Sequence, residues 1–357
     1  MRAFASTLFY SGMIGGLQSK YKRNLVGKAS KAPRVFPFGV LLYHRVNSDL
    51  DPYFPGMSTS VFDAQMAYLA RNYKVLSLGE ILRRMQNGSE IEPYTIAITF
   101  DDGYRDNLTH AHPILKKYQL PATLFVATGY IGSTEAMWND QVSWAFKRTA
   151  RKDFTFEVAN QRSFLSLKSE KDRIRSLSAL LEILKEASDS EKSRIVDYVV
   201  TEFDVEKQSC PSRMLDWTEL RQMVEEGWEV GSHTVNHVIL TRVEPAAAIE
   251  ELRRSKETLE MRLQRPIRSF AYPNGKQSDF DLTIKNLVRQ AGYTIAVTTL
   301  DGLNDRSTDP FEMHRRSPWE PHLPRFALNM LHLYWKEGKS LGLAGSEGRC
   351  VYEAETQ

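Results

Sequence analysis

The chain has 357 residues, enough for one large domain or two smaller ones with a sizeable hydrophobic core. Charged residues make up 25% and hydrophobic residues 42% of it, which is typical of a globular protein and excludes a disordered chain or a bundle of membrane-spanning helices. With 47 basic and 44 acidic residues the net charge is +3, too balanced to indicate nucleic-acid binding, and we expect no nucleic-acid partner.

The first 34 residues form a leader that begins with an uncharged stretch, AFASTLFYSGMIGGLQS at 3–19, followed by several Lys and Arg residues. This stretch lacks the apolar centre and cleavage site of a secretory signal, and its polar residues and glycines make a poor membrane-spanning helix. Two interpretations remain: a segment at a membrane surface backed by basic residues, or a leader packed on the protein itself. Cys210 and Cys350 fit no zinc or redox spacing. We expect a cytoplasmic or membrane-peripheral protein, with secretion or a periplasmic location still open.

Downstream, short apolar segments alternate with amphipathic ones. An amphipathic helix is predicted at 61–72 and another at 245–264. Strands that alternate with helices through short connections indicate a parallel sheet, either open or closed into a barrel. The predicted strands are 39–43, 94–100, 122–128, 227–232, 267–273 and 293–299.

Residues 148–213 interrupt this alternation. The segment is rich in charged residues, and its apolar residues recur at helical spacing, as at Leu177, Leu180 and Leu184. It is predicted to be a mostly helical insertion, which either covers the body of the protein or forms a lid over a substrate. The main domain is then expected to span 35–330, with a C-terminal tail at 331–357.

Two adjacent carboxylates, Asp101 and Asp102, directly follow the apolar run YTIAITF in the sequence TFDDGYRDN. An Asp-Asp-Gly sequence is also an ordinary turn. A second motif, GSHTVNH, places His233 and His237 four residues apart after another predicted strand. A helical turn there would direct both imidazoles to one face, where they could share a metal ion.

The two motifs are expected to meet, because the carboxyl ends of parallel strands lie at one edge of a sheet. Two imidazoles and one carboxylate leave coordination positions open, as in catalytic metal sites. One carboxylate would then hold the metal while its neighbour transfers protons. A two-metal phosphoesterase would require more acidic and histidine ligands than these motifs offer.

Together, TFDDG, SHTVNH and FAYPNG resemble the motifs of polysaccharide deacetylases with a NodB-type domain, carbohydrate esterase family 4. The resemblance extends over about residues 35–320 and implies an α/β fold, a distorted (β/α) barrel of seven or eight strands. It implies that Asp101 is the general base and that Asp102, His233 and His237 hold a divalent metal, usually Zn²⁺. The implied reaction removes N-acetyl groups from an N-acetylhexosamine-containing polysaccharide or glycan precursor. An O-acetyl esterase or a non-catalytic carbohydrate-binding relative is the alternative.

The resemblance offers two candidates for the catalytic acid. His314, in FEMHRRS, lies in the C-terminal region that usually supplies it. His44, in VLLYHRV, resembles the acid of a permuted branch that deacetylates poly-N-acetylglucosamine. We prefer His44 because it directly follows a predicted strand and should lie at the same edge as Asp101. A purely structural role at the strand end is the alternative for His44.

The sequence AYPNG departs from the Arg-Pro-Pro-Tyr-Gly of the family, with Ala271 where an arginine normally orients the base. Arg315 or Arg316 could supply the missing charge, and a surface role is the alternative for both. A tight turn here would let the backbone N–H of Asn274 bind a developing oxyanion.

Several residues are candidates for contact with the acetylated glycan. The turn contributes three of them, and two aromatic side chains could stack on sugar rings, although core packing explains such residues equally well. The candidates are Tyr272, Pro273, Asn274, Tyr104 and Trp138.

Overall fold

The computed structural model describes residues 2–26, 36–158, 161–205 and 209–340. Its centre is a seven-stranded parallel sheet in the order β1-β3-β4-β7-β8-β9, with β2 paired to β3 beside this path. Every residue of β1 and β3 is buried, as expected for strands covered on both faces. The strands are β1 (Gly39–Tyr43), β2 (Lys74–Val75), β3 (Thr95–Phe100), β4 (Thr123–Val126), β7 (Glu229–Ser232), β8 (Ser269–Ala271) and β9 (Ile295–Val297).

The sheet curls into a barrel that closes through an irregular segment rather than a regular strand. Met313 forms a parallel bridge with Val297 in β9, and Arg316 forms one with Leu41 in β1. The segment 313–316 therefore joins the two edges of the sheet. The predicted distorted (β/α) barrel is confirmed.

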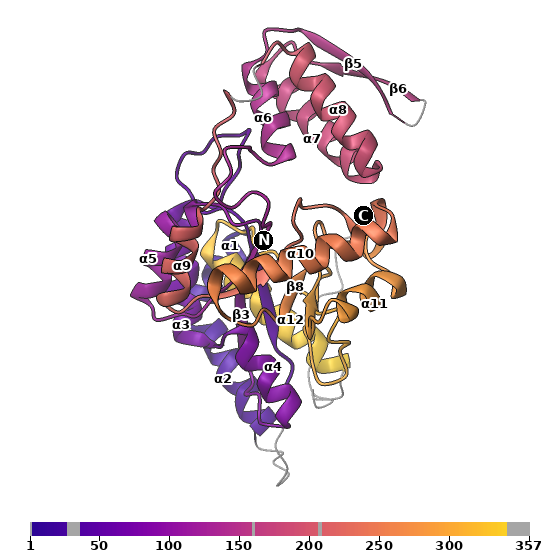
Figure 1. Cartoon of the computed structure of the whole chain (residues 1–357). Helices are drawn as coiled ribbons and strands as arrows, with labels where there is room; N and C mark the ends of the chain where they lie inside the picture. Colours follow the sequence, from indigo (N-terminus) through magenta and orange to yellow (C-terminus); the bar gives the residue numbers. More distant parts are fainter. Residues whose placement is uncertain (1, 27–35, 159–160, 206–208, 341–357) are drawn as a thin grey trace.

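Helices surround this barrel (Figure 1). Their ends carry the expected signals: the Ser58 hydroxyl accepts the N–H of Val61, and Asp216 with Glu219 forms a capping box. The helices are α3 (Thr59–Asn72), α4 (Leu78–Asn87), α5 (His112–Lys117), α9 (Trp217–Glu225), α10 (Pro245–Leu263), α11 (Leu282–Gln290) and α12 (Leu323–Ser340), with a π-helix at Asn107–Ala111 before α5. The predicted domain boundary at residue 331 falls inside α12, and residues 341–357 of the predicted tail lie outside the described residues.

The leader forms two helices, α1 (Arg2–Tyr10) and α2 (Met13–Val26), that pack on the barrel. The hydroxyl of Ser6 lies 3.3 Å from Nε2 of His322, and the amide of Gln18 donates hydrogen bonds to two tyrosine hydroxyls, Tyr68 and Tyr73. Within the described part of the chain, no helix has the length and apolarity needed to cross a membrane. Residues 27–34 of the predicted leader lie outside the described residues.

The insertion forms a separate layer with its own hydrophobic core, at the top of Figure 1. It is predominantly helical as predicted, but α6 packs within it, so the layer starts earlier than residue 148. It also contains an antiparallel hairpin that the sequence analysis did not identify, although the alternating burial of Phe154 and Phe156 is typical of a strand. Its elements are α6 (Trp138–Arg148), β5 (Asp153–Val158), β6 (Gln161–Ser166), α7 (Glu170–Glu186) and α8 (Asp189–Glu202).

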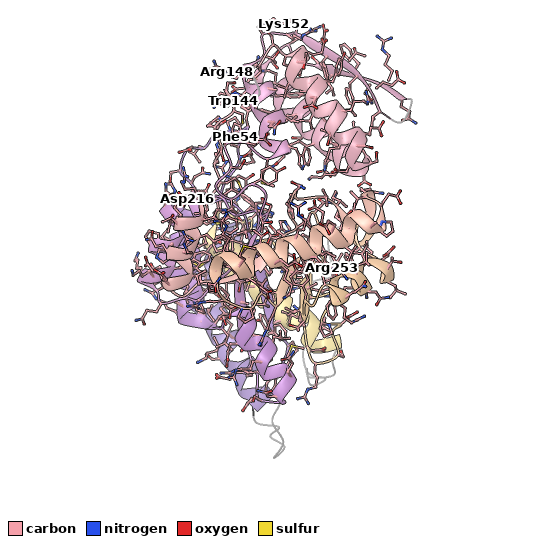
Figure 2. The ribbon with its side chains drawn as sticks, in the orientation of Figure 1. Phe54, Trp144, Arg148, Lys152, Asp216 and Arg253 are labelled. Carbon is pink, nitrogen blue, oxygen red and sulfur yellow. The ribbon has the colours of Figure 1, made fainter. Side chains whose placement is uncertain are left out.

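The insertion rests on the loop that follows β1. Tyr53 and Phe54 from this loop are part of the insertion's core, and Arg173 of α7 donates a hydrogen bond to the Tyr53 hydroxyl. Phe54 also lies next to Trp144, with ring centroids 6.5 Å apart, and Figure 2 shows both along the edge of the insertion with Arg148. The loop after β1 therefore connects the barrel to the insertion.

Candidate active site

The acidic pair lies at the carboxyl end of β3, where the fully buried strand ends. Asp101 and Asp102 are only 2% and 6% exposed, so neither is an ordinary surface turn residue. Asp102 has a φ of 76°, a left-handed conformation that is strained for a side-chain-bearing residue, and Gly103 follows with a φ of 96°. Such strain is usually retained at functional positions. The chain thus turns sharply here and keeps both carboxylates inside.

Two histidines at the end of β7 approach Asp102. Its Oδ1 lies 3.6 Å from Nε2 of His233 and 3.3 Å from Nε2 of His237. All three potential ligand atoms lie within 4.8 Å of one another. Among the described residues no well-directed hydrogen bond reaches the buried Asp102 Oδ1. A buried carboxylate oxygen in this state is expected where a cation binds.

The histidines are not brought together by a helical turn, so that part of the prediction is wrong. Residues 233–237 form an irregular loop in which Thr234 and His237 both have positive φ, 66° and 54°. Glu251 of α10 holds this loop by accepting hydrogen bonds from the backbone N–H groups of Val235 and Asn236, at 2.8 and 2.9 Å. The two imidazoles converge as predicted, but an irregular loop brings them together and not a helical turn.

The orientation of His233 is fixed by the neighbouring strand. Its Nδ1 lies 2.7 Å from the carbonyl oxygen of Ala271 at the end of β8. Because a carbonyl can only accept, Nδ1 carries the proton and Nε2 presents a lone pair towards Asp102. Burial lowers the pKa of His233 to about 4, which keeps the ring neutral. A neutral imidazole is the form that binds a metal.

These residues fit a divalent metal ion. One ionised carboxylate and two imidazole Nε2 atoms are donors suited to zinc or a similar ion, and three protein ligands leave room for water and substrate. Burial raises the pKa of Asp102, but the neighbouring histidines, His237 foremost, outweigh it and hold the pKa well below its usual range. The carboxylate is therefore ionised.

Asp101 is held by a buried arginine from the segment that closes the barrel. Nη1 and Nη2 of Arg315 donate to its two oxygens, each at 2.7 Å, and the arginine is only 1% exposed. Burial raises the pKa of Asp101, but the charge and hydrogen bonds of Arg315 outweigh it, so that the pKa is lowered. Arg316 instead pairs with the exposed Asp301. Of the two candidate arginines, Arg315 is therefore the one that places a positive charge beside Asp101, since position 271 carries an alanine and not an arginine.

Replacement of Arg315 by methionine should lower the free energy of unfolding by about 3–5 kcal/mol, because Asp101 would stay buried without its partner. The lowered pKa of Asp101 stabilises the fold above the carboxylate's unfolded pKa, and this stabilisation is lost as pH falls through the folded pKa. The loss on substitution should therefore be largest near pH 7 and shrink in acid. Urea unfolding at several pH values measures it.

The control for that experiment is Arg316→Met, which removes an exposed ion pair at the neighbouring position. Exposed pairs contribute about 0–1 kcal/mol, so this variant should unfold nearly like the unmodified protein. Equal losses for the two variants would contradict a buried charge pair at Asp101.

The two candidates for the acid lie differently relative to the acidic pair. His44 follows β1 directly and lies close enough to Asp101 and Asp102 for a charge on its ring to lower the pKa of both. His314 lies next to Arg315 in an extended segment, where successive side chains point to opposite faces. Its N–H donates to Asn304, and its ring lies over Gly302. His314 therefore faces away from the side on which Arg315 meets Asp101.

Most of the predicted glycan contacts are packing residues. Tyr272 is 1% exposed, donates its hydroxyl to the Phe311 carbonyl and stacks on another ring, so its buried position does not support contact with a sugar. Pro273 is buried too, and Tyr104 is only 2% exposed. Trp138 is half-buried against the core of the insertion. Asn274, half-buried with a φ of 62°, remains suitable for its predicted role.

The sequence analysis missed the residues that position His44. Nδ2 of Asn107 donates to the His44 carbonyl at 2.7 Å, and Asp106 accepts Nε of Arg45 at 2.9 Å. Both residues are buried and belong to the TFDDGYRDN stretch, so their place beside the acidic pair was the only available signal. The turn after β3 therefore carries the acidic pair and also holds the loop that contains His44.

Comparison with known proteins agrees with this geometry. A family model described as polysaccharide deacetylase matches residues 88–160 and 175–296, more than half of the chain. YxkH of Bacillus subtilis is 21% identical over 277 residues, which cover 77% of this chain and 69% of that relative. A poly-beta-1,6-N-acetyl-D-glucosamine N-deacetylase of Staphylococcus aureus is 35% identical over 88 residues, 24% of this chain and 30% of that protein. The Streptococcus pyogenes deacetylase PplD has the same fold, with a TM-score of 0.55, 20% identity, and coverage of 84% of this chain and 99% of that one.

Proposed function

Because the chain belongs to the polysaccharide deacetylase family, we propose that it removes N-acetyl groups from an N-acetylhexosamine-containing polysaccharide or glycan precursor and releases acetate. The observation that carries this proposal is the buried set Asp102, His233 and His237 next to the arginine-paired Asp101. The S. aureus relative supports the choice of an N-acetylated glucosamine polymer, although the match spans less than a third of that protein.

Asp102, His233 and His237 would hold the metal, which when bound would polarise the acetyl carbonyl and make water easier to deprotonate. Asp101 is ionised and fixed by Arg315, so its carboxylate would accept the proton of the attacking water. The backbone N–H of Asn274, in the turn after β8, would stabilise the negative charge that develops on the carbonyl oxygen. A protonated His44 would donate a proton to the departing amine.

The test is acetate release from N-acetylglucosamine oligomers before and after chelation, with metal restored by zinc and by other divalent ions. We expect release that depends on metal, and no phosphate release from phosphoesters. Preferential hydrolysis of O-acetylated glycans would instead favour the esterase alternative. Absence of turnover on every acetylated glycan, with metal bound, would overturn the proposal.

His44→Ala should retain metal and lose amide hydrolysis by about 10²-fold or more, because the departing amine would receive no proton. An activated aryl acetate needs no such proton, so its cleavage should remain measurable. The alkaline limb of the pH profile for the amide substrate should disappear as well.

His314→Ala is the matched control, since it removes the other candidate acid from a position facing away from Asp101. It should retain nearly normal amide hydrolysis. The reverse pattern, with His314 essential and His44 dispensable, would refute the assignment of the acid.

A further inference from the structure

The two N-terminal helices present an exposed apolar surface. Ten large hydrophobic residues are exposed among the described residues, and four of them lie between positions 4 and 17. The two helices contact each other, and several large apolar side chains exposed on adjoining elements often mark an interaction site. We call these four the α1–α2 face: Phe4, Tyr10, Met13 and Leu17, which are 50%, 80%, 53% and 47% exposed.

The opposite side of the same helices holds them on the barrel. Ala5, Ile14 and Gln18 are buried, and Gln18 bonds to two tyrosines of the barrel. Leu8 and Phe9 pack against the main core as well. The α1–α2 face is thus anchored from behind, and its exposure does not result from a detached segment.

The sequence that contains these helices has a strongly one-sided charge. The first 48 residues contain eight Lys and Arg residues and no Asp or Glu, the first acidic residue being Asp49. Since the chain has 47 basic and 44 acidic residues in all, the remainder carries five more acidic than basic residues. Helix α2 itself contains Lys20, Lys22 and Arg23 after its apolar residues. Helix α2 therefore continues from the exposed Met13 and Leu17 into a stretch with three basic residues and no acidic one.

From these observations we propose that the α1–α2 face docks the protein on a bilayer that contains anionic lipids. Apolar and aromatic side chains would enter the boundary between headgroups and acyl chains, and the basic residues would bind the anionic headgroups. A second copy of the chain fits less well, because face-to-face pairing would bring two positively charged segments together. Binding to the bilayer does not depend on the chemistry proposed above. Its consequence rests on that proposed function: docking would confine hydrolysis to glycans that lie at a membrane surface.

The experiment is co-sedimentation of the full chain with vesicles of phosphatidylglycerol and phosphatidylcholine, compared with phosphatidylcholine alone. We expect binding to the anionic vesicles that weakens as salt is added. Met13→Ser combined with Leu17→Ser should weaken it by about tenfold or more, since each loses apolar area buried in the interface. The matched control is Met261→Ser with Leu282→Ser, the same residue types at positions 68% and 74% exposed elsewhere, which should bind normally.

A second variant tests the charge. Lys20→Glu with Lys22→Glu and Arg23→Glu should weaken binding by at least about fivefold for each basic residue lost. The control is Arg162→Glu with Lys168→Glu and Lys171→Glu, which has the same net charge but alters exposed residues of the insertion. Equal weakening by the two triple variants would show a non-specific charge effect and overturn the proposal.

Two other results would overturn it. One is absence of wild-type binding to anionic vesicles. The other is a wild-type dimer in light scattering that Met13→Ser with Leu17→Ser converts to a monomer without any change in vesicle binding, which would identify a second copy as the occupant. Acetate release from a soluble oligomer is measured in parallel. Because the variants lie outside the barrel, they should leave it unchanged, so failure of docking and failure of deacetylation are distinguishable.

Discussion

Replacement of His233 and His237 together by alanine should reduce bound metal and acetate release to background. These two histidines supply two of the three potential ligand atoms that lie within 4.8 Å of one another. Asp102 alone should not retain the ion. Metal content after dialysis, measured by elemental analysis, and acetate release on an N-acetylglucosamine oligomer are the two readouts. Asp102→Ala should give the same result from the third position.

A control with equal histidine loss is His110→Ala combined with His314→Ala. His110 is exposed and contacts Thr109, and His314 faces away from the acidic pair. This variant should keep its metal and most of its activity. Full metal content after loss of His233 and His237 would show that the ion binds elsewhere.

Asp101→Asn should retain metal while lowering kcat by about 10²- to 10⁴-fold, the usual contribution of a general base. Asparagine preserves the size of the side chain but cannot accept the proton from water. The lowered pKa of Asp101 means that the base is already ionised at neutral pH, so the unmodified enzyme should lose activity only as pH falls through that value. Rates across a pH series, together with metal content, measure both effects.

The neighbouring substitution, Asp102→Asn, should show the opposite division, with metal binding weakened first. The comparison is sharp because the two carboxylates are adjacent and similarly buried. Near-normal turnover in Asp101→Asn, or metal loss from that variant, would contradict the assignment of roles.

The sheet and most of its helices were predictable because their signals are local. Predicted strands at 39–43 and 94–100 and a helix at 245–264 agree with β1, β3 and α10 within a residue. The acidic pair and the histidines were found for the same reason, since each motif directly follows a buried strand. Hydrophobic periodicity and strand ends are properties of short stretches of sequence.

Features that depend on distant contacts were not predictable. In the loop of His233 and His237, two residues other than glycine have positive φ, a conformation that the sequence does not indicate. The loop is also held by a glutamate from α10, which is distant in sequence. The sequence left Arg315 and Arg316 as equal candidates because only the alternation along segment 313–316 distinguishes them. That segment forms two isolated bridges and has no recognisable strand pattern. The burial of Tyr272 was not predictable, because it depends on the packing of the whole barrel.

The closing segment of the barrel also affects the order in which parts of the site can form while the chain is being synthesised. Asp101 and Arg315 are 214 positions apart, whereas all three metal ligands have been synthesised by residue 237. A chain emerging from the ribosome can thus contain all three potential ligands while Asp101 still lacks its arginine. Enclosing an uncompensated carboxylate is costly, which disfavours closure of the barrel around Asp101 until residues 313–316 arrive. The buried pair of Asp101 and Arg315 is therefore expected to form late in folding, after the three potential metal ligands are available.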